Sequence, residues 1–253
     1  MDVIITAGGI PKAEDPLHAF SQGKSKALID VAGKPMVQWV LDAVQSVSYI
    51  ENIVIIGIES KDAISSKKTL FFVPNHGSML KNIRAGVNEV MDLNPSAEYV
   101  MLISSDIPSI SSEMIDWVKE NTKEKDADIY YCVIPRKVME ARFPNSNRSF
   151  IQFKDVDICG GDIIVFRAEV ASGRDVIWNK LIAARKSALK QASLIGFDTL
   201  ILLALRRLTL QGTVRRISNR LGLKGKALIS PYAEIGMDID KPYQLELLRK
   251  DLN

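Results

Sequence analysis

The stretch VIITAGG, residues 3–9, decides the fold of this chain. Residues 3–6 form a short, largely β-branched run, which is typical of a strand buried on both faces of a sheet. Ala7, Gly8 and Gly9 follow with almost no side chain, so a ligand can lie against the backbone there. Bare N–H groups in such a turn can hold phosphate oxygens. The stretch therefore predicts a strand that ends in a phosphate-binding turn.

A second informative stretch, GKSKALIDVAGKPMVQWVL, follows at residues 23–41. In it Lys26 precedes a short apolar run, and Pro35 stands where the first turn of an amphipathic helix is expected. Two other nucleotide motifs are excluded. A Walker P-loop ending at residues 23–25 would need a glycine at position 18, where His18 stands. The G-x-G-x-x-G dinucleotide fingerprint is absent after the first strand.

The rest of the chain alternates apolar runs with helical patterns. Further strands are predicted at residues 53–58, 70–73, 99–103, 129–134 and 163–166, and a basic loop at 140–148. This order predicts an α/β, three-layer, Rossmann-like fold with a mostly parallel sheet flanked by helices. We expect a single domain over residues 1–253, with a basic helical insertion at about 172–226.

Composition narrows the class of protein. The 47% hydrophobic and 25% charged residues are typical of a soluble globular protein. Cys132 and Cys159 lack metal-type spacing, which indicates reduced thiols and a cytoplasmic location. Residues 167–226 hold 13 Lys and Arg against three acids, within a chain of net charge +3. This local excess of +10 predicts an anionic partner, which could be a phosphorylated acceptor, an anionic membrane surface or nucleic acid. The alternative is a solvated helical face.

Acidic residues mark a candidate metal site. Asp106 follows a predicted buried strand, and ligands bind at the carboxyl ends of strands in open α/β sheets. Near the other end of the chain, Asp238 and Asp240 flank Ile239, so that alternation would place both carboxylates on one side. Mg²⁺ prefers such hard oxygen ligands. Turn formation at Asp106 and helix capping before Pro242 are the structural alternatives.

Together these motifs resemble the start and end of the MobA-like NTP transferases. The resemblance implies that Ala7, Gly8, Gly9 and Lys26 hold the nucleotide phosphates. It also implies that Lys26 and Asp106 act in catalysis, and that Asp106 with Asp238 or Asp240 binds Mg²⁺. One departure stands out, because the family usually has an arginine soon after the glycines. Here Lys12 is the basic residue before Lys24, so phosphate contact could pass to Lys12 or Lys24.

Two weaker sites follow from the same resemblance. Gly77, Ser78 and Asn82 fall where the family carries its base-reading loop and helix. The acceptor is expected near Gly160, Gly161 and Asp162, and Arg142 and Arg148 in the neighbouring loop could bind an acceptor phosphate. A plain turn with a helix cap is the alternative for Ser78.

The resemblance implies an Mg²⁺-dependent nucleotidyltransferase. It would transfer an NMP from an NTP to a phosphorylated small-molecule or lipid-linked acceptor, with release of pyrophosphate and without nucleic acid as a partner. A GT-A-type glycosyltransferase that uses an NDP-sugar is one alternative. The single acid in Ser-Ser-Asp-Ile-Pro, residues 104–108, counts against it, because that type usually has Asp-x-Asp there. A non-catalytic nucleotide or lipid-phosphate binding protein is the other alternative.

Overall fold

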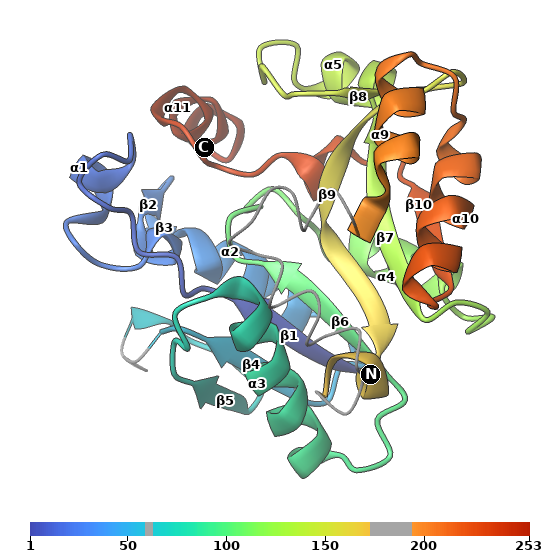
Figure 1. Cartoon of the computed structure of the whole chain (residues 1–253). Coiled ribbons are helices and arrows are strands. Elements are labelled where there is room, and N and C mark those ends of the chain that lie inside the picture. The colour runs from blue at the N-terminus through green and yellow to red at the C-terminus, as the bar shows by residue number, and fades with distance from the viewer. Residues whose placement is uncertain (59–62, 173–193) are drawn as a thin grey trace.

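One eight-stranded sheet organises the structure, a computed structural model that describes residues 1–58, 63–172 and 194–253 (Figure 1). Most of its strands follow the order β10-β7-β9-β6-β1-β4-β5, and β8 pairs with β9. The strands are β1 (Asp2–Thr6), β4 (Ile53–Ile56), β5 (Leu70–Val73), β6 (Tyr99–Ser104), β7 (Ile129–Pro135), β8 (Ile151–Gln152), β9 (Asp157–Arg167) and β10 (Gly225–Ile229). A separate ribbon pairs β2 (Asp30–Val31) with β3 (Lys34–Pro35).

Strand direction places the turns after β1 and β6 side by side. β1 is parallel to β4 on one side and to β6 on the other, with Thr6 opposite Ser104. The carboxyl ends of parallel strands meet at one edge, so the turns after β1 and β6 are neighbours. β9 runs antiparallel to both β6 and β7. The predicted mostly parallel sheet is therefore confirmed, with β9 as its antiparallel member.

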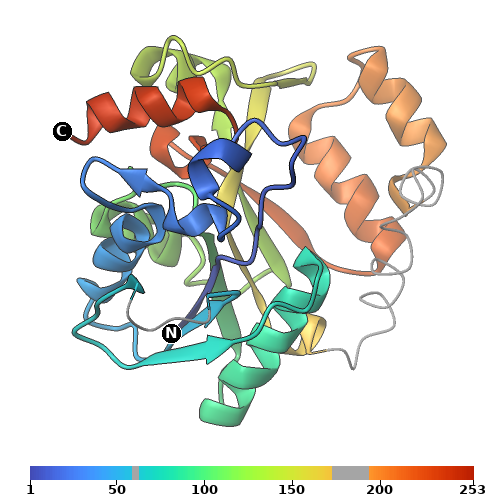
Figure 2. The same ribbon diagram turned by 90° about the vertical axis from the view of Figure 1, so that its left-hand side faces the viewer.

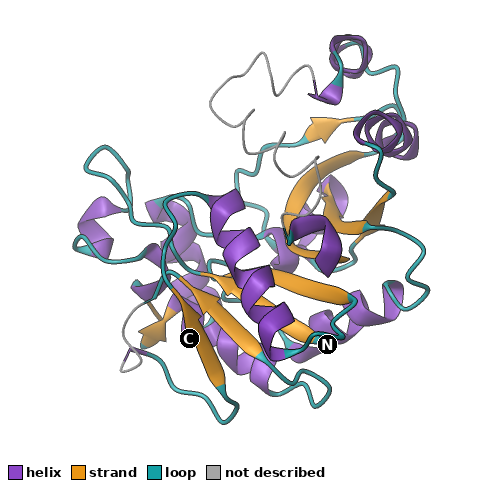
Figure 3. Cartoon of the chain, turned by 60° about the horizontal axis from the view of Figure 1, so that its bottom comes forward, coloured by secondary structure: helices purple, strands orange, loops and turns teal. Residues whose placement is uncertain are grey.

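Helices cover both faces of the sheet (Figure 3). The core on one face includes α2 (Met36–Gln45), α4 (Ser112–Asn121) and α11 (Pro242–Asp251). The other face carries α3 (Met79–Leu93) and α6 (Ala168–Ala171), while α9 (Phe197–Ala204) and α10 (Leu210–Leu221) adjoin a third cluster near β7 and β9. The shorter elements are α1 (His18–Ser21), η1 (Lys26–Leu28), α5 (Arg136–Arg142) and η3 (Ala233–Gly236). Among the described residues, no helix has the length and hydrophobicity needed to cross a membrane.

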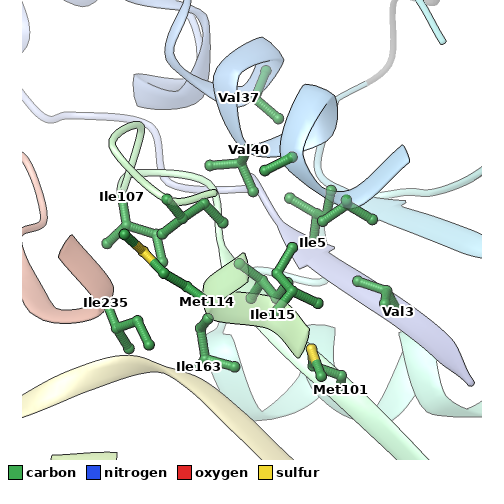
Figure 4. Close-up of a cluster of buried hydrophobic side chains, with 14 of the residues drawn as sticks. Val3, Ile5, Val37, Val40, Met101, Ile107, Met114, Ile115, Ile163 and Ile235 are labelled. Carbon is green, nitrogen blue, oxygen red and sulfur yellow. The ribbon is translucent and has the colours of Figure 1, made fainter. Parts of the chain in front are cut away.

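The largest core cluster supports the end of β1. Ile5 of β1, Val40 of α2 and Met114 of α4 all belong to it (Figure 4). Burying an aliphatic side chain of this size stabilises a fold by about 1.5–3 kcal/mol. On the opposite face, Ile4 belongs to a second cluster with Val87 of α3. Burial on both faces, as predicted for β1, fixes the position from which the glycine turn leaves the sheet.

Some predicted element boundaries were wrong. β9 is 11 residues long rather than the short strand predicted at 163–166, because its glycines and acids hid the strand pattern. The predicted loop at 140–148 begins inside α5, whose Met139 is buried.

The predicted helical insertion also needs a new boundary. Its residues 173–193 lie outside the described residues, and its last two residues belong to β10, which pairs in parallel with β7. Figure 2 shows α9 and α10 at the edge of the molecule opposite α11.

Candidate active site

The glycine turn after β1 is held by neighbouring backbone. Ala7 donates its N–H to the carbonyl of Ile56 at 2.8 Å and so continues the sheet ladder. Beyond it, Gly8 lies against Gly57, whose φ is +90°. A Cβ at Gly57 would stand 2.2 Å from Gly8 Cα, so only glycine fits there. The close approach of two backbones therefore shapes the turn.

A network of asparagines closes the other side of the turn. Asn75 donates its side-chain amide to the Gly8 carbonyl at 2.6 Å and accepts the N–H of Gly77 at 2.8 Å. Asn82, which is buried, accepts the N–H of His76 at 2.7 Å. Asn82 was predicted to read the base, and in this structure its side chain orders the loop before α3. Gly77 itself has a φ of +74°, which favours glycine.

A third loop brings Lys26 to the turn. The Ser25 hydroxyl donates to the Ala7 carbonyl and accepts the N–H of Ala27 at 3.2 Å. The Lys26 N–H donates to the Gly9 carbonyl at 2.8 Å. These bonds place Lys26 at the start of η1, directly beside the two glycines.

The three loops enclose a cavity of about 440 Å³. Its walls include most of the residues predicted to bind the nucleotide: Gly8, Gly9, Lys26, Gly77, Ser78 and Asn82. Asp106, Ser104 and Ser105 line the same cavity from the end of β6. The described lining does not include Ala7, which is buried, or Lys24, which is exposed. The cavity thus joins a glycine turn, a lysine and a carboxylate.

An acidic cluster adjoins this cavity. One carboxylate oxygen from each of Asp106, Asp238 and Asp240 lies within 4.8 Å of the others. The N–H of Ile239 donates to the Asp106 carbonyl at 3.0 Å, which ties the C-terminal turn to the end of β6. Gln244 accepts the N–H of Asp240 at 2.9 Å from the first turn of α11. The two acidic motifs, far apart in sequence, are therefore held together by backbone contacts.

Lys26 pairs with two of these acids. Its Nζ lies 2.6 Å from Asp106 Oδ2 and 2.8 Å from Asp240 Oδ1. Burial alone would lower the pKa of Lys26, but the carboxylates of Asp106 and Asp240 hold that pKa above its ordinary value. Lys26 thus remains a cation between the glycine turn and the acids.

Comparison with known families identifies the family of the chain. The family profile of the MobA-like NTP transferase domain matches residues 4–223. The chain belongs to this family. It is accordingly a nucleotidyltransferase, and the predicted family is confirmed.

Solved structures are similar over almost the whole MobA-like chain. A hypothetical transferase from Thermus thermophilus shares 28% identity with a TM-score of 0.82, covering 96% of this chain and 98% of that one. The CTP complex of CMP:2-keto-3-deoxy-manno-octonic acid synthetase shares 14% identity, a TM-score of 0.55, and coverage of 99% and 97%. A 4-diphosphocytidyl-2C-methyl-D-erythritol synthase from Anaerococcus prevotii shares 14% identity, a TM-score of 0.59, and coverage of 99% and 95%. The last two show a common fold. No curated protein matches the sequence.

Two more charged residues border the acidic cluster of this MobA-like transferase. Arg148 forms an ion pair with the buried Asp238, while its Nε is buried without a hydrogen-bond partner in the described part of the chain. Asp162, on β9, has a buried Oδ2 that likewise lacks a partner there. Burial, reinforced by the negative charge of Asp106, raises the pKa of Asp162 to about 7. Its carboxyl group is therefore partly protonated near neutral pH.

Other residues of the chain fill the space beside the two glycines that were predicted to approach the acceptor. A Cβ on Gly160 would stand 2.3 Å from the Tyr131 hydroxyl, and one on Gly161 would stand 2.9 Å from the Cys132 carbonyl. Both glycines thus serve the packing of β9 against β7. Arg142 donates to Asp251 and Glu234 instead, and none of its described contacts reaches the acidic cluster.

Two residues that shape the site escaped the sequence analysis. Gly57 follows β4 and supports Gly8, and the only signal was a glycine directly after a buried strand. Asn75 belongs to a turn-forming stretch, and its bond to the Gly8 carbonyl spans 67 positions of sequence. Local patterns carry no information on such a distant partner.

Proposed function

We propose that this nucleotidyltransferase moves an NMP from an NTP to a phosphorylated acceptor in an Mg²⁺-dependent reaction. An acceptor phosphate oxygen bonds to the α-phosphorus. The bond from that phosphorus to the bridging oxygen breaks, and pyrophosphate leaves with the electron pair. The chain's part is to position the reactants and stabilise charge. The observation that carries the proposal is the position of Lys26, which lines the cavity beside Gly8 and Gly9 and touches Asp106.

The residues present fit a divalent cation. Asp106, Asp238 and Asp240 offer carboxylate oxygens close together, and such oxygens are the ligands that Mg²⁺ prefers. The cations Lys26 and Arg148 leave one negative charge on these three acids, and Asp162 adds a second when it ionises. Bound Mg²⁺ would neutralise phosphate charge. When a triphosphate occupies the cavity, Lys26 can turn from the acids to the phosphates.

The acceptor phosphate is proposed to bind at Arg148 and Asp162. The unpartnered Nε of Arg148 is a free donor for a phosphate oxygen, and a protonated Asp162 can donate a second hydrogen bond. Both residues border the acidic cluster: Arg148 pairs with Asp238, and Asp162 lies close enough to Asp106 for their charges to interact. Gly160 and Gly161 are weaker candidates for this site, because other residues already fill the space beside them. Arg142 is also a weaker candidate, because it already donates to Glu234 and Asp251.

Pyrophosphate release tests the function. Each of the four NTPs is incubated with Mg²⁺ and a panel of phosphorylated acceptors, and release in excess of NTP hydrolysis is measured. Asp106→Asn should reduce turnover by roughly 10²–10³-fold, because it removes charge at unchanged volume. Asp92→Asn is the matched control, since Asp92 is exposed on α3. Full activity of Asp106→Asn, or no transfer with any pair of substrates, would refute the proposal.

A further inference from the structure

The helix α9 presents large apolar side chains to solvent. Phe197 and Ile201 of α9, and Leu205 at its C-cap, are spaced four residues apart and are 53%, 60% and 59% exposed. Residues at this spacing lie on one face of a helix. The opposite side of α9 packs against the protein, because Thr199 is buried and Leu203 contacts a core cluster. The exposed side, which we call the α9 face, is therefore apolar surface beyond what the core needs.

The charges around the α9 face are positive and unbalanced. Arg206 and Arg207 come directly after Leu205, the C-cap of α9. Both are exposed, and neither has an ion-pair partner in the described part of the chain. The only acid in residues 197–221 is Asp198, against five arginines. Asp198 is already paired with Arg216 at 3.3 Å and Arg220 at 2.9 Å. Residues 197–221, which include α9 and α10, therefore offer no other acid that could neutralise Arg206 and Arg207.

An apolar strip beside unpaired arginines complements one kind of surface. We propose that the α9 face docks on an anionic lipid bilayer, with Phe197, Ile201 and Leu205 in the boundary between headgroups and acyl chains. Arg206 and Arg207 then contact the lipid phosphates. Amphipathic helices bind bilayers through buried apolar area together with attraction to anionic lipids. A binding groove in another protein would have to combine an apolar floor with acids at one end, whereas an anionic bilayer supplies both features everywhere.

Vesicle co-sedimentation of the full chain tests the docking. Phosphatidylcholine vesicles are compared with the same vesicles containing phosphatidylglycerol, at low and high salt. We expect binding to the anionic vesicles that weakens with salt, since exposed charges are screened over about 10 Å at 0.1 M. Phe197→Gln/Ile201→Gln/Leu205→Gln should reduce this binding by at least roughly tenfold, because each glutamine removes apolar area while it keeps helix propensity.

A matched pair of charge variants separates specific contact from overall charge. Arg206→Gln/Arg207→Gln should weaken binding to anionic vesicles by roughly 10- to 30-fold, at about 1 kcal/mol for each arginine near the surface. Arg216→Gln/Arg220→Gln removes the same number of charges from arginines that Asp198 already holds, so it should weaken binding less. Circular dichroism confirms that each variant is folded.

Three results would overturn the inference. They are failure of the folded wild type to bind anionic vesicles, binding that the apolar variant leaves unchanged, and equal losses in the two arginine variants. Sedimentation velocity without lipid adds a fourth test. If the wild type self-associates and the apolar variant does not, the α9 face is an interface between copies of the chain. The proposed transfer reaction is untouched by any of these outcomes, because none of them involves the nucleotide cavity.

Discussion

Lys26 pairs with the carboxylates that are proposed to bind the metal, and it is also proposed to bind the phosphates. In this structure its ammonium group lies between Asp106 and Asp240, so both carboxylates already have a cation. A cation that bound to these acids alone would have to displace Lys26. On the proposed function, a triphosphate would offer Lys26 a new partner and so release the acids. Nucleotide and Mg²⁺ are therefore expected to bind cooperatively.

Replacement of Lys26 should have opposite effects on the two ligands. Lys26→Ala should weaken NTP binding by roughly 10- to 100-fold, since a hydrogen bond to a charged group contributes about 1.5–3 kcal/mol. The same change should strengthen Mg²⁺ binding without nucleotide, because Asp106 and Asp240 lose their cation. Isothermal titration calorimetry measures both affinities.

Two other lysines serve as controls for this variant. Lys34→Ala should change neither affinity, because Lys34 pairs with Asp42. Lys24→Ala tests the predicted phosphate contact of an exposed residue, for which we expect a small effect. If Mg²⁺ bound less tightly to Lys26→Ala than to the wild type, competition between Lys26 and the metal would be ruled out.

Asp162 should make stability depend on pH. Burial raises its pKa in the folded protein to about 7, from an ordinary value of 3.8. Between these values the folded state holds the proton and the unfolded state releases it. The free energy of unfolding should therefore fall as pH rises from about 4 to about 7, with a slope of up to about 1.4 kcal/mol per pH unit.

Urea unfolding across this pH range, with EDTA present, measures the dependence on Asp162. Asp162→Asn should flatten the pH profile and should be most stabilising near neutral pH. Asp155→Asn serves as the comparison, because the Asp155 carboxylate accepts the N–H of Leu210 and takes no part in the acidic cluster. Parallel profiles for the wild type and Asp162→Asn would contradict the assignment.

At the scale of elements, the turn after β4 holds the turn after β1. Gly57 lies so close to Gly8 that no Cβ fits between them. The φ of Gly57 also favours glycine, so this position is constrained twice. The glycine turn therefore depends on a loop that lines none of the cavity's described wall.

Gly57→Ala should disturb both stability and nucleotide binding. A left-handed φ costs roughly 1 kcal/mol for alanine, and the overlap with Gly8 should add roughly 1–3 kcal/mol. Gly33→Ala is a matched control, because Gly33 has a φ of +88° and a Cβ there would meet nothing within 4 Å. Thermal unfolding and NTP titration compare the two. Equal losses would mean that backbone conformation, rather than contact with Gly8, is decisive.

Sequence patterns predicted those elements whose signals are local. The buried strand β1, the glycine turn and the position of Asp106 at a strand end all follow from short stretches. β10 and the length of β9 could not be predicted from short stretches, since their pairing partners are distant and glycine masks the strand pattern. Predictions for Gly160 and Gly161 rested on the room that glycine leaves. The sequence has no signal that Tyr131 and Cys132 fill it.

At the scale of the whole molecule, Arg142 links α5 to the C-terminal helix. It donates to both carboxylate oxygens of Asp251 at 2.7 Å and to Glu234 at 2.8 Å. This geometry indicates a structural link, whereas the place of Arg142 in a basic loop had predicted a contact with an acceptor phosphate. Arg148 borders the acids instead. The two arginines therefore offer a direct comparison.

Arg142→Ala should lower stability by about 0–1 kcal/mol, as is usual for exposed ion pairs, and leave the KM for the acceptor unchanged. Arg148→Ala should raise that KM, since the loss of a ground-state contact appears in KM. Steady-state kinetics with the acceptor identified in the substrate panel measures both variants. A higher acceptor KM for Arg142→Ala would indicate that Arg142 binds the acceptor.

The hydrogen bond from Ile239 to Asp106 also has a consequence for how the enzyme is made. The ribosome completes β1, the glycine turn and Asp106 long before it adds the aspartates of the C-terminal turn. At about 5–20 residues per second, roughly 7 to 26 seconds of translation separate the two halves of the acidic cluster. A nascent chain can thus form its nucleotide turn early but cannot complete the cluster. A chain that ends before residue 238 therefore lacks two of the three carboxylates that the proposed function assigns to the metal.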